Sequence, residues 1–192
     1  MAVESRAVLA GVGGTSLCWV APVGTAAPTD ATSPLDNGWV DLGWVSQDGL
    51  ELEIDEDTND VYGYGSQQKI RTLITSSNQS ITVTFMETNQ RVLEVYHRLP
   101  LNSLSAPDED GAFEFSTGAA TTARYAFCLD MVDGSNHKRA HMAEVEVTAR
   151  ESMTIQAGEV IQYGVTLSPL PQADGNAIDW FYVVSALGSE SV

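Results

Sequence analysis

Apolar and polar residues alternate along several stretches of the chain, which is the pattern of β-strands with one buried and one solvated face. Residues 50–55 alternate leucine or isoleucine with acidic residues, and residues 140–150 alternate valine with glutamate. Other stretches are rich in β-branched and aromatic residues, which favour strands. These further expected strands cover residues 40–46, 69–75, 80–87, 124–132 and 160–167.

Turn residues divide these strands. Asn37-Gly38, Asp48-Gly49 and Asp133-Gly134 are pairs typical of tight turns and hairpins. Residues 55–66 are polar and predict a solvated acidic loop, residues 76–79 a short hairpin loop, and residues 101–121 a long loop.

One helix is expected over about residues 88–99. Thr88 or Asn89 would cap its first turn with a side-chain oxygen, and Pro100 would end it. Its apolar stripe, which we expect to dock on the sheet, consists of Val92, Leu93, Tyr96 and Leu99. A helix of this length is stable only against a neighbouring surface.

Together these elements predict a mainly β fold, a two-sheet β-sandwich or barrel with one flanking α-helix. The β-sandwich domain would cover residues 38–171. Residues 1–37 have no sustained period and predict an extended N-terminal arm without core elements. Residues 172–192 contain a short apolar run at 180–184 and predict a C-terminal arm or a last strand.

The net charge of the chain argues against some classes of binding partner. Nine basic residues against 26 acidic ones give a formal net charge of −17. A nucleic-acid-binding surface needs clustered Lys and Arg, and an anionic membrane surface attracts them, so neither partner is expected to be held. No stretch has the length of a membrane helix. The start of the chain has no net positive charge, since Glu4 offsets Arg6, and it lacks the unbroken apolar run of a secretory signal. Cys18 and Cys128 are expected to be buried free thiols, with a single disulfide as the alternative.

The candidate chemical sites are weak. His137 and His141 follow a turn and are expected at an exposed hairpin tip, where Cys128 would complete a zinc site only by accident of the fold. Residues 55–60 resemble the start of a calcium loop, but Asp60 stands where glycine is needed. The glycine-rich residues 11–15 have neither a preceding strand nor a following lysine. We therefore expect no enzyme, metal or cofactor.

Several segments, in their order, resemble the major tail tube protein of long-tailed, non-contractile bacteriophages, in the form common among phages of actinobacteria. The resemblance spans roughly residues 30–180 and rests on order and pattern. It is carried by LGWVS at 42–46 with Asp48-Gly49, by FMETN at 85–89 followed by Val92-Leu93, by Asp130, Asp133-Gly134 and Arg139, by the strand at 143–149, and by QADG at 172–175.

The resemblance implies a non-enzymatic virion protein, assembled in the host bacterial cytoplasm. Its subunits would form hexameric rings that stack into a tail tube around a tape measure protein, between tail terminator and distal tail proteins. Double-stranded DNA would later pass through the channel without sticking, since acidic walls repel phosphates.

Strand alternation suggests which residues would serve this assembly. Glu51, Glu53, Glu144 and Glu146 are candidates for the lumen, and an outer solvated face is the alternative for them. The candidates for contacts between rings are Asp55, Asp57, Asp60, Tyr62 and Tyr64.

Two other functions remain open on the sequence alone. One is a secreted or surface β-sandwich binding module, in which Trp39, Trp44, Tyr62, Tyr64 and Trp180 would form an aromatic platform. The other is a tube protein of a bacterial secretion or contractile injection system, which shares the fold.

Overall fold

The computed structural model describes residue 9 and residues 16–65, 67–119 and 121–185. The glycine-rich residues 11–15 and the end of the expected C-terminal arm, residues 186–192, lie outside the described residues. The elements are β1 (Cys18–Ala21), β2 (Val40–Asp41), β3 (Val45–Tyr62), β4 (Lys69–Phe85), α1 (Gln90–His97), β5 (Arg124–Asp133), β6 (Asn136–Arg150), β7 (Tyr163–Pro169) and β8 (Asp179–Val183).

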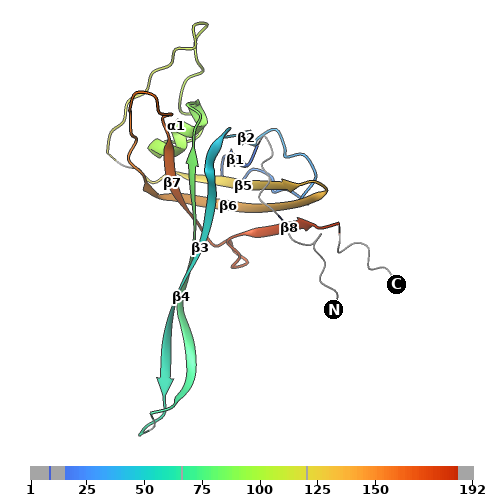
Figure 1. Cartoon of the computed structure of the whole chain (residues 1–192), viewed down its shortest axis with the longest axis vertical. Coiled ribbons are helices and arrows are strands. Elements are labelled where there is room, and N and C mark those ends of the chain that lie inside the picture. Colours follow the sequence, from blue (N-terminus) through green and yellow to red (C-terminus); the bar gives the residue numbers. More distant parts are fainter. Residues whose placement is uncertain (1–8, 10–15, 66, 120, 186–192) are drawn as a thin grey trace.

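The predicted mainly β fold with one flanking helix is confirmed (Figure 1). The strands join by antiparallel pairing into one eight-stranded sheet in the order β2-β1-β5-β6-β7-β4-β3, with β8 added to β6. Strand β6 joins the two halves of this sheet, because β5 pairs on one side of it and both β7 and β8 on the other. In Figure 1 strands β5 and β6 run across the direction of β3 and β4.

Strands β3 and β4 form one long hairpin, so the loop expected at residues 55–66 begins only after Tyr62, and the turns expected at 48–49 and 76–79 are wrong. Asp55 pairs with Asn78 and Asp57 with Ser76 in the middle of the ladder. Gly49, with φ +78°, lies instead where the register shifts between Val45 and Leu50. The prediction failed because a strand that buries neither face needs no hydrophobic period.

The expectation that residues 1–37 hold no core element is also wrong. Strand β1 pairs with both β2 and β5, and its Cys18, Val20 and Ala21 are fully buried. Four residues are too few to show a period in the sequence. At the other end of the chain, β8 pairs with β6 over five residue pairs, so the apolar run near residue 180 is the last strand of the sheet.

Helix α1 begins after Asn89, whose side-chain oxygen accepts a hydrogen bond from the Val92 amide at 2.9 Å. The Thr88 hydroxyl is instead 3.0 Å from the Tyr163 hydroxyl. The helix ends at His97 and is followed by the cap residue Arg98, which has the left-handed conformation with φ 58° and lies two residues before the expected stop at Pro100.

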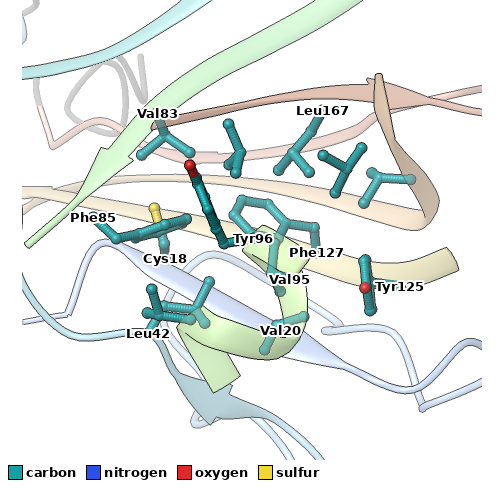
Figure 2. Packing of buried hydrophobic residues seen from close by; sticks show 14 of the residues in the cluster. Cys18, Val20, Leu42, Val83, Phe85, Val95, Tyr96, Tyr125, Phe127 and Leu167 are labelled. Atoms are coloured by element: carbon teal, nitrogen blue, oxygen red, sulfur yellow. The ribbon is translucent and has the colours of Figure 1, made fainter. Parts of the chain in front are cut away.

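The main core lies between α1 and the sheet (Figure 2). Phe85 and Val83 of β4, Tyr125 and Phe127 of β5 and Leu167 of β7 are almost completely buried there. Each lies at an alternate position of its strand, so the intervening residues face the other side of the sheet.

The two cysteines are buried and free, as expected, and strand register keeps them apart. Cys18 lies opposite Leu129 and packs in the main core, whereas Cys128 lies opposite Trp19 and packs with Trp39 in a second, smaller cluster. The two thiols therefore point to opposite faces of the sheet, and no disulfide can form between them without rearrangement.

Candidate assembly surfaces

The first surface is the polar face of the sheet, on the side opposite the core. Glu51 of β3 lies opposite Thr82 of β4, which lies opposite Thr166 of β7. The two threonine hydroxyls are 3.2 Å apart. Glu146 of β6 lies opposite Ser168 of β7, two residues from Thr166 and on the same face. A row of hydroxyls thus connects the acidic residues of β3 to those of β6.

The four carboxylates proposed for the lumen share this face. Glu53 lies two residues beyond Glu51 on β3, and the core residues Ile81 and Val83 alternate with the polar residues of β4. Glu144 and Glu146 both bind Arg124 of β5, at 2.8 and 2.7 Å. The structure therefore brings Glu51, Glu53, Glu144 and Glu146 onto one continuous face of the sheet.

Arg124 is a residue of this face that the sequence did not reveal. Hydrogen bonds to Glu144, and then to Glu146, raise the pKa of its guanidinium. Both carboxylates are consequently paired, whereas Glu51 and Glu53 lie exposed on β3. The polar face is thus more acidic at β3 than at β6. In the sequence, Arg124 is a single arginine at the start of an expected strand. Only the strand register shows that it pairs with Glu144 and Glu146.

The second surface is the outer part of the β3–β4 hairpin, residues 54–78, which extends beyond the other strands (Figure 1). The residues proposed for contacts between rings lie on it: Asp55, Asp57, Asp60, Tyr62 and Tyr64. The Thr72 hydroxyl donates to Asp60 at 2.8 Å, and Lys69 lies 3.3 Å from the same carboxylate. These hydrogen bonds, that of Thr72 first, lower the pKa of Asp60.

The hairpin also exposes large apolar side chains. Tyr64 is fully exposed, Ile70 is 69% exposed and Ile74 is 63% exposed. Ile54 and Tyr62 are more than half exposed as well. A ribbon that displays this much apolar surface on a single chain is a typical interaction element.

The proposed docking face of α1 lies against the sheet. Val92, Leu93 and Tyr96 are buried in the main core and Leu99 packs against it partly buried. Figure 2 shows Tyr96 and Val95 of this helix among the core residues. The Tyr96 hydroxyl donates to the Glu151 carbonyl at 2.7 Å, which fastens the helix to the end of β6.

Glu94 is a buried charge on α1 that the helical pattern did not suggest. Its side chain is fully buried, accepts from the Leu104 amide at 2.9 Å and lies 2.6 Å from Arg91. It ties the start of the long loop after the helix to the helix itself. In the sequence, this ion pair was indicated only by the i, i+3 spacing of Arg91 and Glu94, which is common on solvated helices.

The aromatic residues proposed for a ligand platform do not come together. Trp39 is only 5% exposed and packs against the second cluster, with its indole nitrogen donating to the Ala26 carbonyl at 3.1 Å. Trp180 of β8 stacks with Tyr182, with Lys138 lying over both rings. Trp44 precedes β3 and the two hairpin tyrosines lie at its far end. A shared platform of these five residues is therefore wrong.

Of the two histidines expected at an exposed hairpin tip, only His137 lies at the hairpin end. His137 pairs with Val132 next to the β5–β6 turn and is half-buried, whereas His141 lies further along β6 and is only 2% exposed. Its Nδ1 lies 3.2 Å from an Asp179 oxygen, and its ring lies edge-on to Trp39. Within the described part of the chain, no group of three or more His, Cys, Asp or Glu side chains is placed to hold a metal ion.

Comparison with known proteins gives these surfaces their context. The model of one protein family, described as phage tail tube protein, matches residues 1–184 of the chain. The chain belongs to the phage tail tube protein family. Members of this family are structural proteins of the tail and not enzymes, so the chain is a tail component of the virion that assembles into a tube with other tail components.

Other comparisons add less. No curated protein matches the chain. Among solved structures, the six-fold symmetrised baseplate of the anti-feeding prophage contains a chain with 9% identity, covering 91% of this chain and 97% of that one. The TM-score is 0.44, so this likeness supports no conclusion about the chain. Among the described ranges, no helix of this tail tube protein is long and apolar enough to cross a bilayer.

Proposed function

We propose that copies of this chain close into hexameric rings, that the rings stack into the tail tube, and that the polar face of the sheet lines its channel. The observation that carries the proposal is the continuous row of carboxylates and hydroxyls across β3, β4, β7 and β6, with the core on the opposite side. A sheet with one apolar and one hydrophilic face is what the wall of a water-filled channel requires.

The charge of this face suits a passage for DNA. Phosphates bind proteins through Lys and Arg, and the basic residue described on this face, Arg124, is already paired with Glu144 and Glu146. Glu51 and Glu53 would repel the phosphate backbone during genome ejection. Double-stranded DNA would then be a transient occupant and not a bound ligand.

Ring closure would use the exposed strand edges. Strand β3 has 18 residues and, within the described part of the chain, pairs on one side only, with β4. A long unpaired edge is a template for pairing with another chain. In a ring, each β3 edge would meet the sheet of the neighbouring subunit.

The outer hairpin would make contacts between rings. Asp55, Asp57, Asp60, Tyr62 and Tyr64 lie on the part of the molecule that extends furthest from its core. The outer partners would be the tape measure, tail terminator and distal tail proteins, in a long-tailed, non-contractile phage of the actinobacteriophage type assembled in the host cytoplasm.

Electron microscopy of purified protein over a concentration series, with light scattering on the same samples, tests tube formation. The channel face is tested with a Glu53→Cys variant labelled in assembled tubes with a gold-tagged maleimide. Because Cys18 and Cys128 are buried, the introduced thiol is the reactive one. We expect gold along the channel axis, and away from it for an Ile155→Cys control, because Ile155 is 77% exposed and the nearby Met153 packs against the core on the side opposite the polar face. Gold from Glu53→Cys on the outer wall would overturn the channel assignment.

A further inference from the structure

An exposed turn with Asn37 and Gly38 at its centre lies just before β2. The Trp39 amide donates to the Asp36 carbonyl at 3.0 Å and closes this turn. Both central residues are exposed, and both line an open hollow of about 250 Å³ at the surface. Within the described part of the chain, neither the Asn37 carboxamide nor the Gly38 amide takes part in a hydrogen bond. The two groups are adjacent in the chain, unpaired and reached by water.

The other six asparagines of the chain are placed differently. Asn59 and Asn78 lie within the β3–β4 ladder, where strand pairing constrains their backbone. The remaining four have side-chain amides that form hydrogen bonds: Asn89, Asn102, Asn136 and Asn176. None of the six is followed by glycine. Asn37 is therefore the asparagine whose side chain is free to reach the next backbone nitrogen, and glycine hinders that approach least because it has no side chain.

This arrangement favours an intramolecular reaction of the backbone. The Gly38 nitrogen attacks the carboxamide carbon of Asn37. A new C–N bond forms, the bond to the side-chain nitrogen breaks, and that nitrogen leaves as ammonia with the proton of the Gly38 amide. Because Asn37 is exposed, the rotation that brings the two groups together moves no packed side chain.

The product of this step is a five-membered succinimide, which solvent water opens at either of its two carbonyl groups. Opening at one carbonyl gives aspartate at position 37 and restores the normal main chain. Opening at the other gives isoaspartate, in which the main chain runs through the former side-chain methylene. Both products gain one carboxylate.

The main chain at this turn has little room to lengthen. A Cβ at Gly38 would lie 2.9 Å from the Thr25 methyl carbon, so the turn lies close against Thr25. On its other side, Trp39 is only 5% exposed and its indole donates to the Ala26 carbonyl at 3.1 Å. Isoaspartate adds one methylene, about 1.5 Å of main chain, between these two contacts. Strand β2 follows directly and pairs with β1 at two positions, so it has few contacts to resist the displacement.

We propose that Asn37 is a site of spontaneous deamidation, and that its isoaspartate product loosens β2 from the edge of the sheet. Both products change the formal net charge of the chain from −17 to −18. Only isoaspartate also lengthens the main chain. The substitution Asn37→Asp supplies the charge without the extra methylene, and it is the matched control for the second half of the proposal.

The site is tested by incubating the purified protein at neutral pH and physiological temperature. Peptide mass spectrometry measures the replacement of the amide by a carboxylate at each asparagine. Isoaspartate is measured as labelled methyl transfer from S-adenosylmethionine by an isoaspartyl methyltransferase. We expect Asn37 to react about tenfold faster than Asn102 or Asn176, because the nitrogen that attacks Asn37 belongs to glycine.

Asn37→Gln is the control for the site, because attack on its longer side chain must close a six-membered ring. It should abolish most of the methyl transfer. Intact Asn37 after prolonged incubation, or equal rates at Asn37 and Asn102, would overturn the site and with it the whole proposal.

Hydrogen exchange tests the effect on β2. The isoaspartate form is separated from the incubated protein and compared with Asn37→Asp. We expect the amides of Val40 and Asp41 to exchange about tenfold faster in the isoaspartate form, because the strand opens locally more often. Equal exchange in the two proteins would overturn the loosening of β2 and leave the deamidation site standing. Neither readout depends on tube formation, so failure of one proposal is distinguishable from failure of the other.

Discussion

Arg139 shows how single side chains hold the loops of this protein on its sheet. Its guanidinium is only 4% exposed and binds both oxygens of Asp130, at 2.9 and 2.6 Å. Its remaining nitrogen donates to the carbonyls of Asp30 and Ser33, at 2.9 and 2.8 Å. One buried cation thus fixes the segment before β2 to β5 and β6. Burial of this charge is tolerated because the guanidinium is paired with a carboxylate and hydrogen-bonded to two carbonyl groups.

Gly43 provides a test at the same scale. Its φ is +83°, and a Cβ there would overlap the carboxylate of Glu87, which accepts from the Trp44 amide at 2.9 Å. We expect Gly43→Ala to lower the free energy of unfolding by about 3 kcal/mol, because backbone strain and overlap add. Chemical denaturation of the monomer measures it.

Gly49→Ala is the matched control. Gly49 has a similar φ of +78° but nothing within 4 Å of an added Cβ, so strain alone should lower the free energy of unfolding by about 1 kcal/mol. Equal losses for the two variants would show that the contact with Glu87 is unimportant.

The buried thiols predict a loss of stability in alkali. Burial, and then the charge of Asp130, raises the pKa of Cys128 to about 12, and burial raises that of Cys18 further. Unfolded thiols ionise near pH 8.5, so above that pH the unfolded chain releases protons that the folded chain retains. The free energy of unfolding should fall by about 1.4 kcal/mol per pH unit and thiol.

This fall is measured by denaturation at pH 8, 9 and 10, compared with a Cys18→Ala/Cys128→Ala variant. The variant should lose most of the slope over this window. Tyr125, whose pKa burial also raises, contributes only above pH 10, where free phenols ionise. An identical slope in both proteins would contradict the assignment.

At the scale of elements, the contrast between the two halves of the β3–β4 hairpin is the main feature. Near its base, Ile81, Val83 and Phe85 are buried in the core. Beyond Ile54 the same two strands bury nothing and are held by their backbone ladder and by pairs such as Ser76 with Asp57, at 2.9 Å. An isolated two-stranded ribbon is marginally stable in water, which favours contact with a partner in the assembly.

Helix α1 has one element-level test. Asn89→Ala removes the acceptor of the Val92 amide and the donor to the Leu42 carbonyl, at 2.9 and 3.2 Å. We expect a loss of about 1 kcal/mol in the free energy of unfolding, measured by denaturation. Asn78→Ala, in the exposed hairpin, should change it by less than about 0.5 kcal/mol. A loss from Asn89→Ala no larger than this would show that the cap is not used.

At the scale of the whole molecule, charge sets the conditions of assembly. A hexameric ring would carry 6 × −17 = −102 formal charges. Such repulsion opposes association at low salt, and it weakens as the screening length falls from about 30 Å at 0.01 M to about 3 Å at 1 M.

We therefore expect the protein concentration at which tubes first form to decrease as NaCl rises from 0.01 to 1 M. Sedimentation and electron microscopy across a salt series measure this. The same series with sucrose in place of salt should have little effect on repulsion. Tubes that dissolve as salt rises would show that attraction between opposite charges dominates the interfaces.

The sequence by itself determined the elements that have a period or a turn signal. The helix with its Asn89 cap and apolar face, the strand at residues 124–132 and the Asp133-Gly134 turn all follow from local chemistry. The order of segments also pointed to the tail tube family, which the family match over residues 1–184 supports.

Only the tertiary structure decided the remainder. The four residues of β1 and the polar outer hairpin carry no hydrophobic period, because the first is too short and the second has no core to face. The pairing of Arg124 with Glu144 and Glu146, and the alignment of these with Glu51 across four strands, depend on strand register. Register is the alignment of strands that are distant in the sequence, and no local pattern of residues specifies it.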